Sequence, residues 1–348
     1  MDKRLRIAHV MASVGGVMGG LEKHTFELCA ALAEKHEVHL LADKPYSVTC
    51  PKNIIFHAID FSQSRWNPFL YWQIVQVIND IQPQIIHAQA GKAVELVSIM
   101  KWFFQHIIFV ATIHSHKSIN KAYLSMDGVI ATNKAAVLGL SPKKTRVIYH
   151  GLKPSTLLLP HETKSFRQRL SLTPDEPLII AIGELVPFNG FDVLLRACVG
   201  TEAKLLIVGE GGERKKLEKL VAVLALQQQV FFLGARQDVP QLLQLADLCV
   251  IPSVIATFPT VMLEALQVGC PVIATDIGGT NDWLPEALLC PPDNVEALHT
   301  LLCDTLRRLS VLRTNYLPIF LRAQQELTID GMTQRTQEFY QALLEQHR

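Results

Sequence analysis

The chain has 348 residues, and its 33 basic side chains nearly balance 32 acidic ones. This length suits two domains of ordinary size better than one. Without a basic run or a nucleic-acid motif, the sequence gives no reason to expect binding of nucleic acid. No uncharged apolar run is long enough to span a bilayer, and the N-terminus enters a predicted strand without a signal-peptide core.

The charges are unevenly distributed along the chain. Residues 1–152 hold 16 Lys and Arg against 10 Asp and Glu, a balance of +6. Residues 153–348 hold 17 against 22, a balance of −5. This asymmetry predicts different partners for the two halves, and the basic half would fit an anionic surface such as a membrane. Chance scatter of surface charge is the simpler alternative.

The cysteines are dispersed, and none has the C-x-x-C spacing of a redox or zinc motif. Most lie in apolar segments, which is typical of reduced core residues in a cytosolic protein. We therefore expect neither a disulfide framework nor a metal site. The seven are Cys29, Cys50, Cys198, Cys249, Cys270, Cys290 and Cys303.

In the first half, short apolar strands alternate with helical patterns, as in a parallel α/β sheet. Strands are predicted at 5–12, 38–42, 54–59, 84–88, 107–113, 128–132 and 146–149. Helices are predicted at 21–34, 66–81 and 92–104.

Two features of this half point to a ligand. The Gly-rich loop 13–20 follows the first strand, and glycine lets backbone approach a ligand closely, although the spacing is not that of a dinucleotide fingerprint. His114 and His116 follow a predicted strand, and ligands of open α/β sheets bind at the carboxyl ends of strands. For either histidine alone, a structural role is the commoner explanation.

A proline-containing stretch, 151–176, reads as a linker before a second α/β pattern. Strands are predicted at 178–183, 204–208, 230–233, 248–251, 272–275 and 287–290. Helices are predicted from 191, at 213–226, after 240, in the segment 251–279, and at 295–309, 313–326 and 332–346.

The segment 251–279 reads as strand, loop, short helix, strand and a Gly-Gly turn. Pro259 suits the opening of a helix, and Gly269 suits its end. Free amides at such a helix start can hold an anion such as a phosphate, and Glu264 could bind sugar hydroxyls. An ordinary βαβ unit with a solvated Glu264 is the equally simple alternative.

Taken together, the motifs resemble the GT4-like group of retaining, nucleotide-sugar-dependent glycosyltransferases with the GT-B fold. The resemblance covers nearly the whole chain, and it rests on the order and spacing of its parts rather than on any one of them. The parts are 19–24 (Gly-Gly-x-x-x-His), 112–114, 129–132, 147–151, 183–195, 207–211, 232–234, 246–247 and 252–279.

The resemblance implies a fold of two Rossmann-like, doubly wound parallel-sheet domains that face a cleft. The first, 1–152, would bind the acceptor and would include a C-terminal helix, about 331–348, that crosses back to it. The second, 153–330, would bind the nucleotide sugar.

The resemblance also implies roles for individual residues. Glu264 would bind the ribose, and amides near Phe258, Pro259, Thr260 and Val261 would hold the diphosphate. Gly234 and Arg236 would face the base. In the first domain His114 would bond the donor sugar, and Gly16, Gly19 and Gly20 would border the phosphates. No metal or other cofactor is implied, because helix ends and cations would neutralise the leaving diphosphate.

Three positions depart from the family pattern. Ala256 stands where the first acid of Glu-x₇-Glu is expected, and Glu184 and Asn189 stand where an Arg and a Lys usually contact the diphosphate. Other cations could compensate for this loss. The candidates are Arg236, Arg214, Lys215 and Lys216.

The implied function is transfer of a sugar from a nucleotide sugar to a cell-surface polysaccharide or glycolipid, such as lipopolysaccharide. The enzyme would be cytoplasmic or peripheral at the inner membrane face. The aromatic clusters 66–72 and 102–104 could contact anionic lipid, although burial in the core is slightly favoured for both. One alternative is a catalytically degenerate GT-B protein that binds another glycosyltransferase as a partner or scaffold. A sugar-nucleotide epimerase on the same fold is the third possibility.

Overall fold

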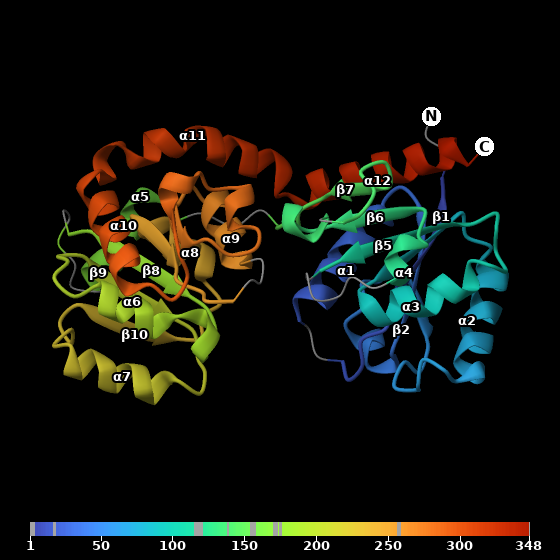
Figure 1. Cartoon of the computed structure of the whole chain (residues 1–348), viewed down its shortest axis with the longest axis horizontal. Coiled ribbons are helices and arrows are strands. Elements are labelled where there is room, and N and C mark those ends of the chain that lie inside the picture. Colours follow the sequence, from blue (N-terminus) through green and yellow to red (C-terminus); the bar gives the residue numbers. More distant parts are fainter. Residues whose placement is uncertain are drawn as a thin grey trace. The chain divides into compact units, whose positions relative to one another are not determined.

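The computed structural model describes residues 4–16, 19–114, 121–137, 139–153, 158–169, 173, 176–255 and 259–347. The chain divides into two compact units, each built around its own parallel sheet. Unit 1 comprises 1–151 and 328–348, and unit 2 comprises 152–327 (Figure 1). The predicted boundary after residue 152 differs from this division by one residue, and the predicted return at about 331 differs by three.

Unit 1 contains a seven-stranded sheet in the order β3-β2-β1-β4-β5-β6-β7, and every neighbouring pair is parallel. The order reverses beside β1, which is the position where open α/β sheets bind ligands. The strands are β1 (Arg6–Met11), β2 (Glu37–Ala42), β3 (Ile55–Ala58), β4 (Ile85–Gln89), β5 (Ile108–Ile113), β6 (Gly128–Ala131) and β7 (Thr145–Val147).

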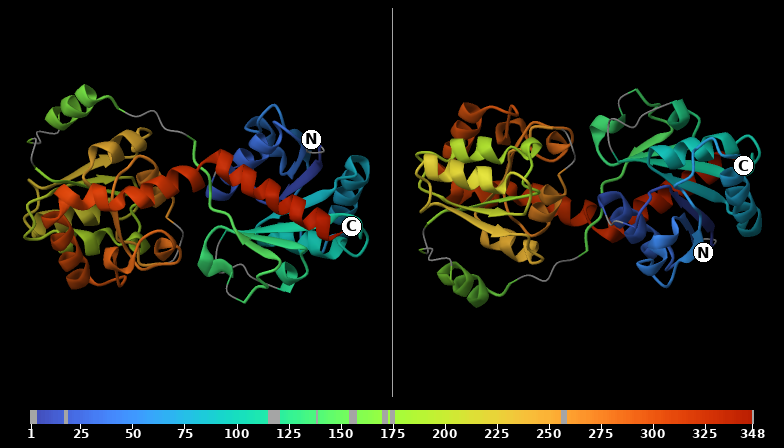
Figure 2. Two further views of the ribbon diagram at one scale, coloured as in Figure 1. Left: turned by 90° about the horizontal axis from the view of Figure 1, so that it is seen from above. Right: turned by 90° about the horizontal axis from the view of Figure 1, so that it is seen from below.

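Helices cover both faces of this sheet (Figure 2). One face packs against α1 (Gly20–Leu32) and against α12 (Ile329–Gln346), which brings the C-terminal part of the chain back to unit 1. The other face packs against α2 (Pro68–Ile81), α3 (Gly91–Met100) and α4 (Lys121–Leu124). Burial on both faces explains why the strands read as continuous apolar runs.

Unit 2 contains a six-stranded parallel sheet in the order β10-β9-β8-β11-β12-β13. The strands are β8 (Leu178–Ile182), β9 (Lys204–Val208), β10 (Val230–Gly234), β11 (Leu248–Ile251), β12 (Val272–Thr275) and β13 (Leu289–Cys290). The helices are α5 (Pro160–Arg169), α6 (Phe191–Ala197), α7 (Arg214–Val223), α8 (Val239–Leu245), α9 (Thr260–Gln267), α10 (Val295–Arg307) and α11 (Leu309–Glu326).

Two glycines allow the loops of unit 2 to pack backbone against backbone. A Cβ at Gly190 would lie 2.0 Å from the Pro252 carbonyl oxygen, and one at Gly209 would lie 1.9 Å from the Gly183 carbonyl oxygen. Both glycines have positive φ values, 66° and 142°. Only glycine fits these close approaches. The two glycines therefore let the loops that follow β8, β9 and β11 meet at one edge of the sheet.

Two predicted elements differ from the structure. The stretch 151–176, expected to be a linker, contains helix α5. The helix expected at 92–104 ends at Met100, where a turn begins with a bond from the Phe103 amide to the Met100 carbonyl. That turn returns Phe104 to the core and leaves Trp102 and Phe103 exposed at the surface.

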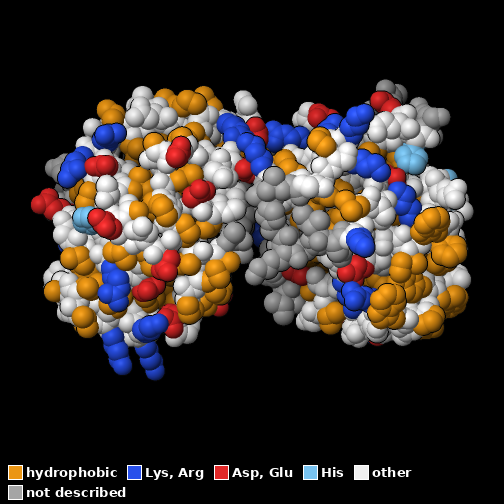
Figure 3. Space-filling view, in the orientation of Figure 1, with side chains coloured by type: hydrophobic (Ala, Val, Ile, Leu, Met, Phe, Trp, Pro, Cys, Tyr) orange, Lys and Arg blue, Asp and Glu red, His pale blue; other side chains and the backbone are white. Residues whose placement is uncertain are grey.

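The slight preference for burying both aromatic clusters was wrong. Trp66, Phe69 and Trp72 are 72%, 52% and 55% exposed, and Trp102 and Phe103 are 82% and 76% exposed. In each cluster a neighbouring apolar residue fills the core position instead. We call these five residues the aromatic surface of unit 1. Figure 3 shows apolar side chains gathered where α2 and α3 lie.

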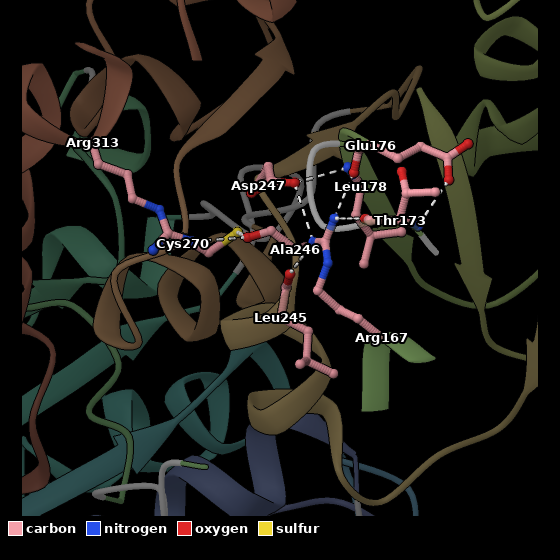
Figure 4. A network of polar contacts seen from close by, with 9 residues as sticks. All are labelled: Arg167, Thr173, Glu176, Leu178, Leu245, Ala246, Asp247, Cys270 and Arg313. Carbon is pink, nitrogen blue, oxygen red and sulfur yellow. Dashed lines mark hydrogen bonds and ion pairs between the residues drawn. The ribbon is translucent and has the colours of Figure 1, made fainter. Parts of the chain in front are cut away.

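The guanidinium group of Arg167 bonds helix α5 to the edge of the unit 2 sheet (Figure 4). Arg167 Nη1 lies 3.4 Å from both the Leu245 carbonyl oxygen and Asp247 Oδ2, and its Nη2 donates to the Glu176 carbonyl. The same Asp247 oxygen accepts from the Leu178 amide at 2.9 Å, at the start of β8. Arg167 therefore joins the segment before the sheet to the sheet itself.

We expect Arg167→Leu to lower the free energy of unfolding of unit 2 by about 1–2 kcal/mol, because it removes charge-assisted bonds from a partly buried carboxylate and from backbone carbonyls. Arg307→Leu is the control, since Arg307 pairs with Asp304 on an exposed helix surface, and we expect it to cost less than about 0.5 kcal/mol. Urea denaturation followed by circular dichroism measures both. Equal losses in the two variants would contradict the role of Arg167.

Candidate functional site

Unit 2 contains a pocket of about 240 Å³ at the edge of the sheet where β8 and β11 end. Its lining combines backbone-rich loops with the start of α9 and few charged groups. The lining residues are Ile182, Gly183, Asn189, Phe191, Ile251, Pro252, Ser253, Pro259, Thr260, Val261 and Glu264. Four of the residues predicted to bind the donor, Glu264, Pro259, Thr260 and Val261, are therefore brought together here.

Helix α9 presents its first turn and one carboxylate to this pocket. Pro259 is the N-cap and makes no side-chain cap bond, so among the described residues no cap side chain competes with an anion for the first amides. Gly269, at φ 77°, follows the last turn as the sequence predicted. Met262 and Leu263 are buried on the opposite side, which fixes the orientation of Glu264 toward the pocket.

The positions that depart from the family pattern lie in the loop after β8. Asn189 lines the pocket, and its Nδ2 donates to the Glu184 carbonyl at 2.7 Å. The Glu184 side chain is exposed and is not among the described residues that line the pocket. Glu184 therefore adds no negative charge to the pocket wall, while Asn189 supplies a neutral amide where a cation was expected.

The cations considered as replacements are held mainly by carboxylates. Arg236 Nε and Nη2 bond both oxygens of Asp238 at 2.8 and 2.6 Å. Arg214 bonds Glu210 at 2.9 Å and Glu218 at 2.7 Å. Lys216 pairs with Glu213, whereas Lys215 has no ion pair within the part of the chain that the structure describes. Gly234, expected beside the base, ends β10 at φ 70°.

Several predicted residues fall outside the described part of the chain. They are Ala256, Phe258 and His116. Their predicted roles stay predictions.

In unit 1, the Gly-rich loop connects β1 to α1. Gly15 and Gly16 have φ values of 96° and 70°, and the Gly15 amide donates to Asp43 Oδ2 at 3.3 Å. The Gly19 amide donates to Glu22 Oε2 at 3.0 Å, which satisfies one amide at the start of α1, and Gly20 is the first residue of that helix. Two of the loop amides are thus already bonded to carboxylates within unit 1.

His114, the predicted catalytic residue, belongs to a group of five histidines on the face of the sheet that α1 and α12 cover. His9 and His87 are partners in the register of β1 and β4, with ring centroids 4.9 Å apart. The His24 ring, from α1, lies 4.9 Å from His114 and 5.2 Å from His150.

Polar contacts tie this histidine cluster together. His24 Nδ1 and His150 Nδ1 are 2.9 Å apart, so one donates to the other. His87 bonds Thr112 Oγ1 and the Tyr340 hydroxyl, each at 2.6 Å. Gln89 lies between His114 and His9. Its Oε1 is 3.1 Å from His114 Nε2, and its Nε2 is 3.3 Å from His9 Nδ1. These polar contacts form three groups, and the ring contacts of His9 with His87 and of His24 with His114 join the groups into one cluster.

Burial keeps these imidazoles neutral. It lowers the pKa of His9 to about 3. Burial, with repulsion from His150, lowers the pKa of His114 to about 4. Burial, with repulsion from Lys23, likewise lowers the pKa of His150 to about 4. Burial and neighbouring histidines also hold the pKa values of His24 and His87 well below the usual value. At neutral pH each ring therefore offers one donor and one acceptor.

Sequence reasoning had singled out His114 but missed most of its partners. His24 and His150 were present only as members of the motifs at 19–24 and 147–151, and His9, His87 and Gln89 were not singled out. A signal was present for His9, His87 and Gln89, because each lies an even number of positions from an apolar strand residue of the same buried face. Recognising it requires knowing that β1 lies beside β4, which spacing along the chain does not give.

Among the described residues, no group of three or more His, Cys, Asp or Glu side chains is arranged to hold a metal ion. All seven cysteines are free thiols. No helix within the described ranges is both long enough and apolar enough to cross a bilayer.

Two protein families match consecutive parts of the chain. Residues 18–156 match "Glycosyltransferase Family 4", and residues 162–307 match "Glycosyl transferases group 1". The first match lies within unit 1 apart from its last residues, and the second lies within unit 2.

Among curated relatives, the chain is 37% identical over 145 residues to an uncharacterized glycosyltransferase of Methanocaldococcus jannaschii, covering 39% of this chain and 37% of that protein. It is 29% identical over 244 residues to a putative teichuronic acid biosynthesis glycosyltransferase of Bacillus subtilis, covering 63% and 60%. Across the relatives compared, the chain spans 30% to 60% of their length.

Two solved structures share the fold over nearly the whole chain. The Anabaena protein HepE, in complex with UDP, has a TM-score of 0.82 at 21% identity and covers 97% of this chain and 100% of its own. A glycosyltransferase from Rickettsia africae has a TM-score of 0.83 at 19% identity, covering 99% and 100%. The predicted two-domain parallel-sheet architecture is thereby confirmed.

The histidine cluster makes the stability of unit 1 depend on pH. The five pKa values are lower in the folded chain than the unfolded value of about 6.5, so the unfolded chain binds more protons below that pH. We expect the free energy of unfolding to fall as pH drops from about 6.5 toward 4, by up to about 1.4 kcal/mol per pH unit for each histidine. Urea denaturation at pH 7.5, 6.5 and 5.5 measures this fall, and hydrogen-exchange mass spectrometry assigns it to a unit.

His9→Phe should reduce the slope by one proton, whereas the same change at the exposed His106 should leave it unaltered. A pH-independent transition for unit 1 would contradict the neutral, buried cluster.

Proposed function

Because the chain belongs to the GT4-like glycosyltransferases of the GT-B fold, we propose that it transfers a sugar from a nucleotide diphosphate sugar to a hydroxyl of a cell-surface polysaccharide or glycolipid. Unit 2 would bind the donor, and unit 1 would bind the acceptor. Both family matches and both structural neighbours support this assignment.

One observation carries the proposal: Glu264 and the first turn of α9 line the same pocket, beside the loops that follow β8 and β11. A nucleoside diphosphate needs a partner for its ribose hydroxyls and a partner for its phosphates. The Glu264 carboxylate is a strong acceptor for two hydroxyls, and the uncapped amides of α9 suit phosphate oxygens. The Gly183 and Ser253 loops would lie against the nucleotide from the other sides.

In the reaction the bond between the anomeric carbon and the diphosphate oxygen breaks, and the acceptor hydroxyl oxygen forms the new glycosidic bond. The hydroxyl proton leaves with the nucleoside diphosphate. The α9 amides would stabilise the charge that develops on the leaving oxygen, so we propose that no metal ion is needed. Retention of the anomeric configuration follows from the family resemblance, and His114 would bond the transferred sugar.

The identity of the donor can be approached from the neighbours. HepE has been solved in complex with UDP and with UDP-glucose. We therefore propose a uridine diphosphate sugar as the first donor to test. An acceptor of the polysaccharide or lipopolysaccharide class is supported by relatives named for teichuronic acid and Vi polysaccharide biosynthesis and by the galactosyltransferase of the lipopolysaccharide outer core.

We further propose that the aromatic surface of unit 1 contacts an anionic membrane, where a glycolipid acceptor would be found. Indole rings prefer the headgroup region, because one part of the ring is apolar and the other carries a polar N–H. Unit 1 holds 18 Lys and Arg against 13 Asp and Glu, which adds a weak attraction to anionic lipid. Free cysteines fit a cytoplasmic location at such a membrane.

Binding of nucleotides tests the proposed donor site. We expect UDP and UDP-glucose to bind in isothermal titration calorimetry, with EDTA present or absent, and Glu264→Ala to weaken binding by about 10- to 150-fold. That factor corresponds to the roughly 1.5–3 kcal/mol of a charge-assisted bond. Glu286→Ala, at an exposed carboxylate in the last part of unit 2, is the matched control and should bind normally.

If no UDP, GDP, ADP or CMP derivative binds, the donor-site proposal fails, and the scaffold for a partner glycosyltransferase becomes the better account. Binding that EDTA abolishes would refute only the metal-free step.

Vesicle sedimentation at low salt tests the membrane contact. We expect vesicles that contain anionic phospholipid to retain more protein than neutral ones, and the double change Trp102→Ser with Phe103→Ser to lower the partition coefficient at least tenfold. Each ring contributes roughly 1.5–3 kcal/mol when fully buried in an apolar phase. Val223→Ser, at an 81% exposed position in unit 2, is the control. Equal retention by both kinds of vesicle would rule out the contact.

A further inference from the structure

Gln89 is a buried amide at the end of β4 that touches two imidazoles from the neighbouring strands. Its side chain is 1% exposed. Its Nε2 lies 3.3 Å from His9 Nδ1, and its Oε1 accepts from His114 Nε2 at 3.1 Å. An amide nitrogen only donates and an amide oxygen only accepts. One side chain therefore determines the hydrogen-bonding role of a nitrogen on each ring.

The rest of the network does not fix these roles. His87 bonds two hydroxyl groups, those of Thr112 and Tyr340, and each hydroxyl can donate or accept. His9 Nε2 is buried and has no hydrogen-bond partner among the described residues, so nothing else there determines the tautomer of His9. Gln89 is thus the one group in this network whose two ends have opposite and fixed character.

We propose that Gln89 is a positioning residue that holds the proton of His114 on Nε2, so that Nδ1 presents a lone pair to a sugar hydroxyl. This inference rests on the proposed function for its ligand, but the tautomer itself is a property of the free protein. A lone pair accepts a hydrogen bond from a hydroxyl and repels acceptor-only groups such as phosphate or carboxylate oxygens. His114 therefore selects a neutral, hydroxyl-bearing part of the donor rather than its diphosphate.

The same geometry couples His114 to His9. When Gln89 Nε2 donates to His9 Nδ1, the proton of His9 must lie on Nε2, as it does on His114. Reversing the amide would move both protons to Nδ1 together, because each contact would exchange donor and acceptor. The two histidines therefore change tautomer as a pair, and only through Gln89.

Two variants separate these roles. Gln89→Glu supplies an acceptor to both rings, so it should keep the proton of His114 on Nε2 while moving that of His9 to Nδ1. Gln89→Leu supplies neither donor nor acceptor, so His114 should become a mixture of tautomers. A purely structural role for Gln89 predicts no such opposite response of the two rings.

Long-range ¹H–¹⁵N spectra of the ¹⁵N-histidine-labelled full chain at pH 7 measure the tautomers, and the variants His114→Gln and His9→Gln assign the signals. We expect a protonated, pyrrole-type Nε2 and an unprotonated, pyridine-type Nδ1 for His114 in the wild type. Gln73→Leu, at a partly buried glutamine on α2, is the matched control and should move neither signal. A protonated Nδ1 in the wild type overturns the inference, even if the Gln89 variants do not fold.

A binding measurement links the tautomer to the ligand. Gln89→Leu should weaken UDP-glucose by about 2- to 12-fold, the range of a net hydrogen bond, and leave UDP unchanged. If the variant binds both ligands equally more weakly, or binds both as tightly as the wild type does, the assigned ligand group is overturned. If neither ligand binds the wild type while His114 keeps its proton on Nε2, the proposed function fails and the tautomer assignment stands.

Discussion

Every neighbouring pair of strands in the two sheets is parallel, and the arrangement of both candidate sites follows from that constraint. Parallel strands need a crossover between them, so the segments that follow the strands all leave from one edge. In unit 2 this brings the loops after β8 and β11 to the start of α9. In unit 1 it brings the ends of β4 and β5 beside each other, with Gln89 and His114 in contact.

The loops at the carboxyl ends of the strands are fixed in different ways in the two units. Unit 2 relies on close backbone packing, and unit 1 relies on hydrogen bonds between buried polar side chains. Unit 2 uses glycines whose missing side chains let carbonyl groups approach, and among the described lining residues of its pocket only Glu264 is charged. Its arginines at 214 and 236 are held by carboxylates, whereas the start of α9 lines the pocket directly. Unit 1 instead buries neutral histidines, whose bonds are directional and depend on the position of each proton.

Much of this could be predicted from the sequence, because local signals determine it. The order of strands and helices follows from hydrophobic periodicity, and the limits of α9 follow from Pro259 and Gly269. The exposure of Trp102 and Phe103 could not be predicted, because one turn after Met100 decides which aromatic residue enters the core. The pairing of His9 with His87 depends on β1 lying beside β4, and strand order is not a local property.

The return of α12 to unit 1 has a consequence for how the protein is made. During synthesis the strands of unit 1 leave the ribosome well before the residues that cover them, since Phe339, Tyr340 and Leu343 belong to the same core as β1. Unit 2, which lies between these segments in the chain, is complete before α12 emerges. Until then one apolar face of the first sheet lacks part of its cover, so the nascent chain is a natural substrate for chaperones during that interval.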